Sequence, residues 1–273
     1  MAASDLITLA QAQAWLGVND SVSNTILTSL ITSISRAIYS MMQRPTIFPA
    51  TYSETFDGNG GNAISLKNWP ALAVSSAFMD GTSILAAPAL PLSPVRSYGL
   101  GWVLGVTDSS PPGRPATLYL RGGRWTRGIQ NVAVTYTAGY QVAETQTIAA
   151  GALTALQPYG AWATDQGVTY ASTGTALTKV ANSPAQGQYS VAAGAYTFAS
   201  ADNAASVILT YGFVPADLAQ AALEWAALRF KSKDSVGWKS KSLGGQETMS
   251  VDTGAMPLAV AMMVQPYKRV MPC

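Results

Sequence analysis

Residues 21–45 predict a long helix with one strongly apolar face. The apolar residues recur at steps of three and four, which places them on one side of a helix with 3.6 residues per turn: Ile26, Leu27, Leu30, Ile31, Ile34, Ala37, Ile38, Met41 and Met42. The opposite face carries Ser, Thr, Asn and Arg36. A helix of about six turns with this pattern needs packing partners, either in this chain or in a neighbouring subunit.

Flanking residues fix the ends of this helix and predict a second one before it. Asp20 or Ser21 can cap the start, and Pro45 stops the end because the residue before a proline avoids the α region. Upstream, Thr8 precedes the sequence LAQAQAWL and Gly17 follows it, which predicts a short capped helix. The two helices would form an αα-hairpin.

Charged residues make up only 11% of the chain, against roughly 25% in ordinary soluble domains, while 48% of residues are apolar. Polarity therefore comes from Ser, Thr, Asn, Gln and Gly. Such a surface suits a permanent assembly, and it also fits a secreted or β-rich domain with a Ser/Thr surface. No apolar run approaches the roughly 18 residues that cross a bilayer, and residues 1–6 do not resemble a signal peptide, so we expect a soluble protein. The single cysteine, Cys273, excludes an intrachain disulfide.

Alternating patterns predict strands through the middle of the chain. Residues 52–56 and 63–66 flank the turn residues 57–61, which predicts a β-hairpin. The proline-rich residues 84–115 predict a long surface excursion. Further strands are expected at residues 73–79, 117–121 and 131–136.

Residues 141–206 differ in composition, being rich in Ala, Gly and Thr and almost uncharged. The motif VAVTY before them is echoed by VILTY after them, and each is followed closely by a glycine and an aromatic residue. Short alternating segments at 168–170, 177–180, 188–191 and 195–198 predict an inserted all-β domain, sandwich- or barrel-like. The expected core then comprises residues 1–140 and 207–273.

Two helices are expected near the C-terminus. Pro215 and Asp217 begin the first, which ends near Lys231, and its expected buried face is Leu218, Ala221, Ala222, Trp225, Ala226 and Leu228. Residues 257–264 predict the second. The fold class is therefore α+β: a small helical core, a hairpin-rich middle and an inserted β domain. The long helix is expected to pack on residues 9–16 and on the Pro215 helix, leaving its Ser/Thr face for a neighbouring subunit.

The residue inventory argues against catalysis. The chain has no histidine, which excludes Ser-His-Asp and Cys-His arrangements and histidine-containing zinc sites. The loop of residues 58–61 lacks the lysine of a P-loop. A carboxylate-pair hydrolase using Glu54 and Asp57 is the remaining enzymatic alternative. We expect no enzyme, no cofactor and no metal.

Two basic clusters allow both a structural and a binding interpretation. The first interleaves with Tyr119 and Trp125 and contains Arg114, Arg121, Arg124 and Arg127. The second surrounds only Asp234 and contains Arg229, Lys231, Lys233, Lys239 and Lys241. Each is either a solvated hairpin or helix end, or a surface for weak, salt-dependent contact with the DNA backbone.

The order of these motifs resembles the head–tail connector (adaptor, or head completion) proteins of tailed phages. The resemblance rests on LITLAQAQAWLGV with the long helix ending in Arg-Pro, the hairpin with its downstream Trp-Pro and Asp-Gly, VTYTAGY, VPADLAQAALEWAALRF and QPYKRV. It covers about residues 1–140 and 207–273, and the block 141–206 departs from the minimal family pattern.

The resemblance implies a homo-oligomeric ring that matches the portal's twelve-fold symmetry, in the virion neck at the head–tail junction. Such a ring would be assembled in the host cytoplasm, would guide and retain DNA until ejection, and would offer its lower surface to a neck or tail completion protein. The implied partners include no membrane. The implied portal contacts are Pro257, Met262, Met263, Pro266, Tyr267, Lys268 and Arg269, and Lys231, Lys233, Lys239 and Lys241 would face portal or channel DNA.

The alternative function is a carbohydrate- or surface-binding β module fused to a helical assembly domain. It rests on four aromatic residues of the insertion that could stack on sugars: Trp162, Tyr170, Tyr189 and Tyr196. In alternating strands such residues also serve as core.

Overall fold

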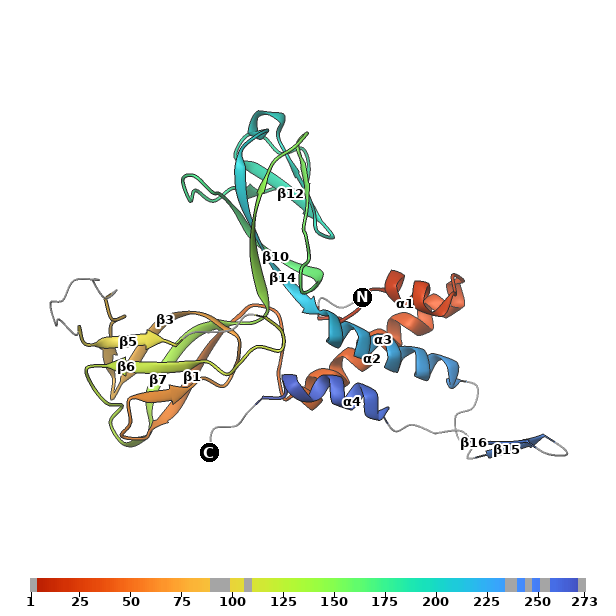
Figure 1. Cartoon of the computed structure of the whole chain (residues 1–273), viewed down its shortest axis with the longest axis horizontal. Helices are drawn as coiled ribbons and strands as arrows, with labels where there is room; N and C mark the ends of the chain where they lie inside the picture. Colours follow the sequence, from red (N-terminus) through yellow and green to blue (C-terminus); the bar gives the residue numbers. More distant parts are fainter. Residues whose placement is uncertain are drawn as a thin grey trace. The chain divides into compact units, whose positions relative to one another are not determined.

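The computed structural model describes residues 4–88, 99–105, 110–233, 240–243, 247–250 and 256–269 (Figure 1). The chain forms two compact units. The helical unit comprises Met1–Pro45 and Pro215–Lys268, and the β unit comprises Thr46–Val214 and Arg269–Cys273. The α+β class is confirmed. Residues 46–140 form their own sheets and lie in one compact unit with the segment 141–206, whereas the predicted inserted domain at 141–206 stays a prediction.

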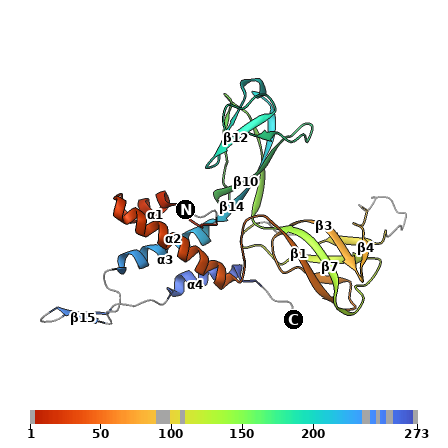
Figure 2. The ribbon, with the colours of Figure 1, turned by 180° about the vertical axis from the view of Figure 1, so that it is seen from behind.

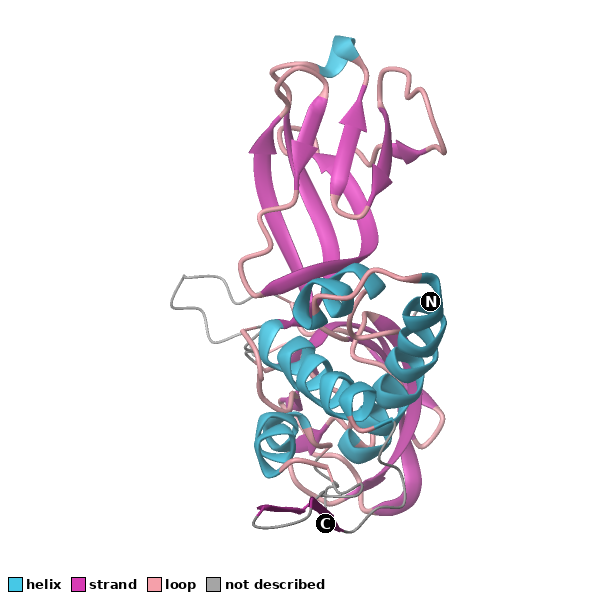
Figure 3. Cartoon of the chain, turned by 90° about the vertical axis from the view of Figure 1, so that its right-hand side faces the viewer, coloured by secondary structure: helices cyan, strands magenta, loops and turns pink. Residues whose placement is uncertain are grey.

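The helical unit contains the four predicted helices, cyan in Figure 3: α1 (Leu9–Leu16), α2 (Ser21–Met42), α3 (Ala216–Lys231) and α4 (Leu258–Val264). A capping box between Thr8 and Gln11 starts α1, and Gly17 ends it at φ 68°. Asp20 caps α2 by accepting the Ser23 N–H at 2.8 Å, and hydrogen bonds from the Ser23 hydroxyl and from this N–H lower the pKa of Asp20. The short 3-10 helix η3 (Gln265–Tyr267) follows α4, and the strands β15 (Ser240–Leu243) and β16 (Glu247–Ser250) pair with each other.

The apolar face of α2 is the centre of this unit, as predicted. Leu27, Ile31 and Ile38 are fully buried, and α2 packs against α1, α3 and α4. From α3, Leu218, Ala222 and Trp225 enter the same core. Leu228 was expected there but is 38% exposed, because the helix turns this position outward near its end.

The first part of the β unit contains two antiparallel sheets around one core (Figure 2). One has the order β1-β7-β3-β4 and the other β2-β6-β5. Their apolar faces share the buried Phe56, Ile64, Leu118, Trp125 and Val134. The strands are β1 (Ala50–Gly58), β2 (Ala63–Ser65), β3 (Ala71–Met79), β4 (Thr82–Ile84), β5 (Gly101–Leu104), β6 (Thr117–Arg121) and β7 (Gly128–Ala138).

The predicted hairpin of residues 52–66 is wrong in its pairing. β1 pairs with β7, and β2 pairs with β6. The turn between them is hydrogen-bonded to the backbone of Trp125. The Gly60 N–H donates to the Trp125 carbonyl, and the Trp125 N–H donates to the Gly61 carbonyl. The two strands therefore diverge into different sheets. The strand β5 was also missed, since it lies within the stretch predicted as a surface excursion.

The second part of the β unit holds two further open sheets, of order β10-β14-β8 and β11-β12-β13-β9. The predicted strands near residues 168, 178, 188 and 195 are present, whereas β8 and β9 were not predicted. None of the described sheets closes into the barrel that was one form of the prediction. The strands are β8 (Gln141–Thr147), β9 (Ala152–Thr154), β10 (Gly160–Tyr170), β11 (Thr178–Lys179), β12 (Gln188–Ala192), β13 (Ala195–Phe198) and β14 (Ser206–Pro215).

Candidate functional site

Carboxylate side chains are held by tyrosine hydroxyls in both units. The Tyr136 hydroxyl donates to Glu54 at 2.7 Å and the Tyr170 hydroxyl to Asp202 at 2.7 Å. The same arrangement joins Tyr211 to Glu144, Tyr189 to Asp165, and Tyr267 to Asp217. Burial, reinforced by the Glu54 carboxylate, raises the pKa of Tyr136 far above its ordinary value. Burial and Glu144 raise the pKa of Tyr211 to about 12, so both hydroxyls remain donors.

Two of these pairs repeat one geometry, and they lie in the two echoed motifs. Glu54 on β1 is in register with Val134, two residues before Tyr136 on β7. Glu144 on β8 is in register with Leu209, two residues before Tyr211 on β14. In both cases the tyrosine oxygen also accepts a backbone N–H at 3.0 Å, from Asn68 and from Gln157 respectively. The sequence echo therefore marks a repeated diagonal Tyr–Glu cluster.

The two carboxylates of the hydrolase alternative have structural partners. Glu54 accepts from Tyr136, from the Asn68 side chain and from Arg269, whose Nη2 lies 3.1 Å from Oε1. Asp57 accepts the Gln130 N–H at 2.6 Å. These bonds fasten β1 to its neighbours. Among the residues with described positions, no cluster of three metal-ligating side chains is found.

Of the four aromatic residues proposed to stack on sugars, two are buried and two, Trp162 and Tyr170, are half-buried. Tyr189 and Tyr196 are buried, and both hydroxyls donate to Asp165. The Trp162 indole donates to the Tyr196 hydroxyl at 3.2 Å, and Tyr170 is tied to Asp202. Tyr189 and Tyr196 therefore build the interior of the strand-rich segment, and the hydroxyl of Tyr170 and the indole of Trp162 are used in hydrogen bonds within it. The structural interpretation of this set is the one that the geometry favours.

The residues of the first predicted basic cluster differ in their exposure. Trp125 is fully buried, so it belongs to the core, while Arg114, Arg124 and Arg127 are exposed. Arg121 donates to the Pro88 carbonyl at 2.9 Å.

In the second cluster, Lys231 and Lys233 are exposed at the end of α3, and the Lys233 ammonium lies 4.8 Å from the Phe230 ring centroid. Lys239 lies outside the described residues. Lys241 is placed only as a backbone position of β15.

Residues 257–269, the segment implied to contact a portal, include both buried and exposed side chains. Tyr267 is fully buried, and its hydroxyl donates to Asp217, so its side chain belongs to the core of the helical unit. Met262 is 68% exposed, and Leu258, one turn earlier on α4, is 76% exposed. Leu258 was missed because sequence alone did not show which apolar residues of α4 are internal.

The remaining members of that segment vary in exposure. Pro266 and Lys268 are exposed, whereas Pro257 and Met263 are half-buried. Arg269 is half-buried in its pairing with Glu54. It clusters with the β unit rather than with the helices.

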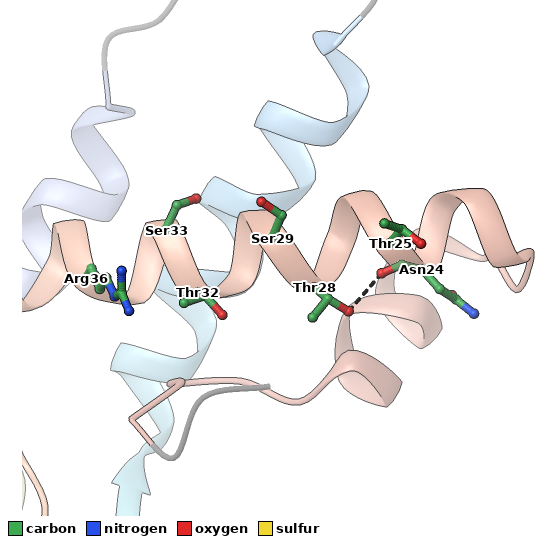
Figure 4. Close-up of a pocket in the computed structure, with 7 residues that line it drawn as sticks. All are labelled: Asn24, Thr25, Thr28, Ser29, Thr32, Ser33 and Arg36. Carbon is green, nitrogen blue, oxygen red and sulfur yellow. Dashed lines mark hydrogen bonds between the residues drawn. The ribbon is translucent and has the colours of Figure 1, made fainter.

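The polar face of α2 is a shallow hollow lined by short side chains (Figure 4). The Thr28 hydroxyl donates to the Asn24 carbonyl at 2.8 Å, and the Ser33 hydroxyl donates to the Leu30 carbonyl. The Thr32 hydroxyl instead donates to the Asp5 carboxylate, outside the helix, at 3.2 Å. The lining residues are Asn24, Thr25, Thr28, Ser29, Thr32, Ser33 and Arg36.

No protein-family model and no curated protein matches the chain. Among solved structures, it is similar to a chain in the neck of an empty GTA particle computed with C6 symmetry, with 13% identity and a TM-score of 0.39. It is also similar to a chain in the virion of a native gene transfer agent (GTA) particle, with 12% identity and a TM-score of 0.40. Each match covers 98% of this chain and 92% of the other. In the described part of the chain, no helix is both long and apolar enough to span a membrane.

Proposed function

We propose that this chain is a structural adaptor of a tailed-phage neck, one subunit of a ring beneath the portal that joins the DNA-filled head to the tail. The observation that carries the proposal is the exposed apolar pair Leu258 and Met262 on α4. The opposite side of this short helix is anchored by Val260 and Val264, which are buried. The pair is therefore presented by a fixed element, as expected of a docking helix.

Other features support an assembly role over a catalytic one. The low charge of the chain and the Ser/Thr face of α2 suit contacts between copies. The carboxylates of both units act as acceptors for tyrosines, which is a structural use. The resemblance in motif order supplies the further details: a twelve-fold ring, docking on the portal through α4 and the residues after it, a lower surface for a completion protein, and retention of DNA passing the exposed Lys231 and Lys233.

The docking role is tested with Met262→Asp in the full-length chain. A charge at the centre of an apolar contact costs about 2 kcal/mol or more, so portal affinity should fall by about thirtyfold. Ile129→Asp is the matched control, because Ile129 is 86% exposed and lies in the β unit. Binding to purified portal is measured by sedimentation, with circular dichroism as the folding check. Equal affinity of Met262→Asp and the control would overturn the proposed docking face.

A further inference from the structure

Three of the four arginines of the first predicted basic cluster lie around one glycine turn of the β unit. The Arg124 Nη1 lies 3.5 Å from the Gly60 carbonyl oxygen. Arg127 lies against the same glycine, since a Cβ built on Gly60 would come within 3.0 Å of the Arg127 Nε. Arg121 and Arg124 line a hollow together with Gly61, Asn62, Leu120, Gly122 and Gly123. We call the three arginines and this hollow the arginine site.

The backbone of Trp125 holds the arginine site in place. The Trp125 side chain is fully buried in the core of the two sheets. Its N–H donates to the Gly61 carbonyl at 2.8 Å, and its carbonyl accepts the Gly60 N–H at 2.9 Å. Arg124 and Arg127, on either side of this anchor in the sequence, are exposed. The backbone that carries both arginines is therefore fixed before any ligand arrives, which lowers the entropic cost of binding.

The charges of the arginine site are not neutralised within the described part of the chain, where no carboxylate oxygen lies within 4.0 Å of these three guanidinium groups. The acidic residues of the adjoining turns have other hydrogen-bond donors. Asp57 accepts the Gln130 N–H at 2.6 Å, and Asp80 accepts the Asn131 amide at 3.0 Å. Arg121 donates one N–H to a backbone carbonyl. Because a guanidinium has five N–H donors and keeps its charge, most donors of the site remain for an external anion.

Phosphate groups are the anions that suit this arrangement. Arginine binds phosphate oxygens through two parallel N–H donors, and the charge of three neighbouring arginines matches the repeated charge of a nucleic-acid backbone. The glycines that line the hollow have no Cβ, so a ligand can approach their backbone closely. Leu120 is the apolar member of the lining, and it is only 4% exposed. The hollow therefore lacks the apolar anchor around which protein interfaces are built.

We propose that the arginine site binds the phosphate backbone of double-stranded DNA. Such a contact is independent of base sequence and weakens as salt is added. The site lies in the β unit, whereas Lys231 and Lys233, which the proposed neck function assigns to DNA, lie in the helical unit. The inference does not rest on the neck function, because a chain that forms no ring would still bind DNA through these arginines.

Fluorescence anisotropy of a labelled DNA duplex tests the proposal with the full-length chain. The double variant Arg124→Gln/Arg127→Gln loses two phosphate contacts. The slope of log affinity against log salt should become shallower by about 2, and affinity should fall about tenfold at low salt. The matched control is Arg36→Gln/Lys268→Gln, which loses the same charge from exposed positions of the helical unit and should keep the original slope. Circular dichroism checks the folding of each variant.

A second double variant separates charge from geometry. Arg124→Lys/Arg127→Lys keeps both charges but loses the paired N–H donors, so its affinity should fall about threefold while the salt slope is retained. A slope as shallow as that of the glutamine variant would contradict the proposed phosphate contacts.

Three outcomes would overturn the proposal. The first is an equal salt slope in the glutamine variant and its control, and the second is no DNA binding by the unmodified chain at low salt. The third concerns an acidic protein segment, the competing occupant, because Leu100 is 63% exposed and packs against Gly123 at the rim of the hollow. Tighter binding of poly-glutamate than of the duplex, lost in the glutamine variant, would identify that occupant instead.

Discussion

The β1–β7 and β8–β14 pairs hold a tyrosine and a glutamate in the same diagonal relation but complete the cluster with different donors. At Glu54 the remaining donors are the Asn68 amide and the charged Arg269. At Glu144 they are the Gln146 amide and the Leu156 N–H, which are neutral and lie in the same strand-rich segment. The first cluster therefore ties the C-terminal segment to the sheet, while the second is closed within its own sheets.

This difference shows how one local device serves two purposes. A carboxylate that accepts a tyrosine hydroxyl satisfies two buried polar groups at once, which suits a chain with few charges. With a neutral third donor the cluster is a fixed part of the fold. When the third donor is an arginine from a distant part of the chain, the cluster also fixes that part of the chain to the sheet.

Removing the tyrosine hydroxyls should lower the free energy of unfolding the most, and the loss should be larger for Tyr136 than for Tyr211. Tyr136→Phe leaves the buried Asn68 N–H without its acceptor, although Glu54 keeps the Asn68 amide and Arg269 as donors, and a cost of about 3 kcal/mol of unfolding free energy is expected. Tyr211→Phe removes the equivalent bonds, but the Gln157 N–H that loses its acceptor is only half-buried, and a cost of about 2 kcal/mol is expected. Urea denaturation followed by tryptophan fluorescence measures both. A larger loss in Tyr211→Phe would refute the distinction between the clusters.

Alkaline pH should weaken both clusters. The pKa of Tyr211 is about 12 in the folded chain and about 10 when unfolded, so the folded state retains its proton more strongly. The stabilisation is fully present below pH 10 and is lost as the pH rises from 10 to 12. Stability measured by urea titration over this range should fall less steeply in Tyr211→Phe than in the unmodified chain. Identical slopes would contradict the assignment.

The sequence predicted this chain best where a single residue decides the local structure. Thr8, Gly17, Asp20 and Pro215 mark helix ends through capping or a fixed backbone angle, and those ends were located within a few residues. Pairing of strands depends on distant partners instead. Residues 52–66 read as a hairpin because both segments alternate, yet the backbone around Trp125 holds the turn and separates them.

The candidate surfaces were only partly predictable for the same reason. Periodicity placed apolar residues on α4 but could not separate Met262 from the buried Val260. Tyr267 was assigned to a partner although its hydroxyl bonds within the unit. The Tyr–Glu clusters did carry a sequence signal, in the paired echoes of Glu54-Thr55 with Tyr136 and of Glu144-Thr145 with Tyr211, which becomes interpretable once the register is known.

The smallest expected effect separates the charged from the neutral donor. Arg269→Gln should cost about 1 kcal/mol at low salt and less at high salt, because ion pairs near the surface are screened. Gln146→Met should cost a similar or smaller amount with no dependence on salt. Thermal unfolding at two salt concentrations tests this contrast. Equal salt dependence of the two variants would remove the distinction.

The most direct test of the proposed neck function is electron microscopy of the full-length chain, alone and mixed with a purified phage portal assembly. The account predicts a closed ring of copies that docks coaxially on the portal, and loss of docking in Met262→Asp with the ring retained. A chain that stays monomeric in both samples and shows no affinity for the portal would contradict it.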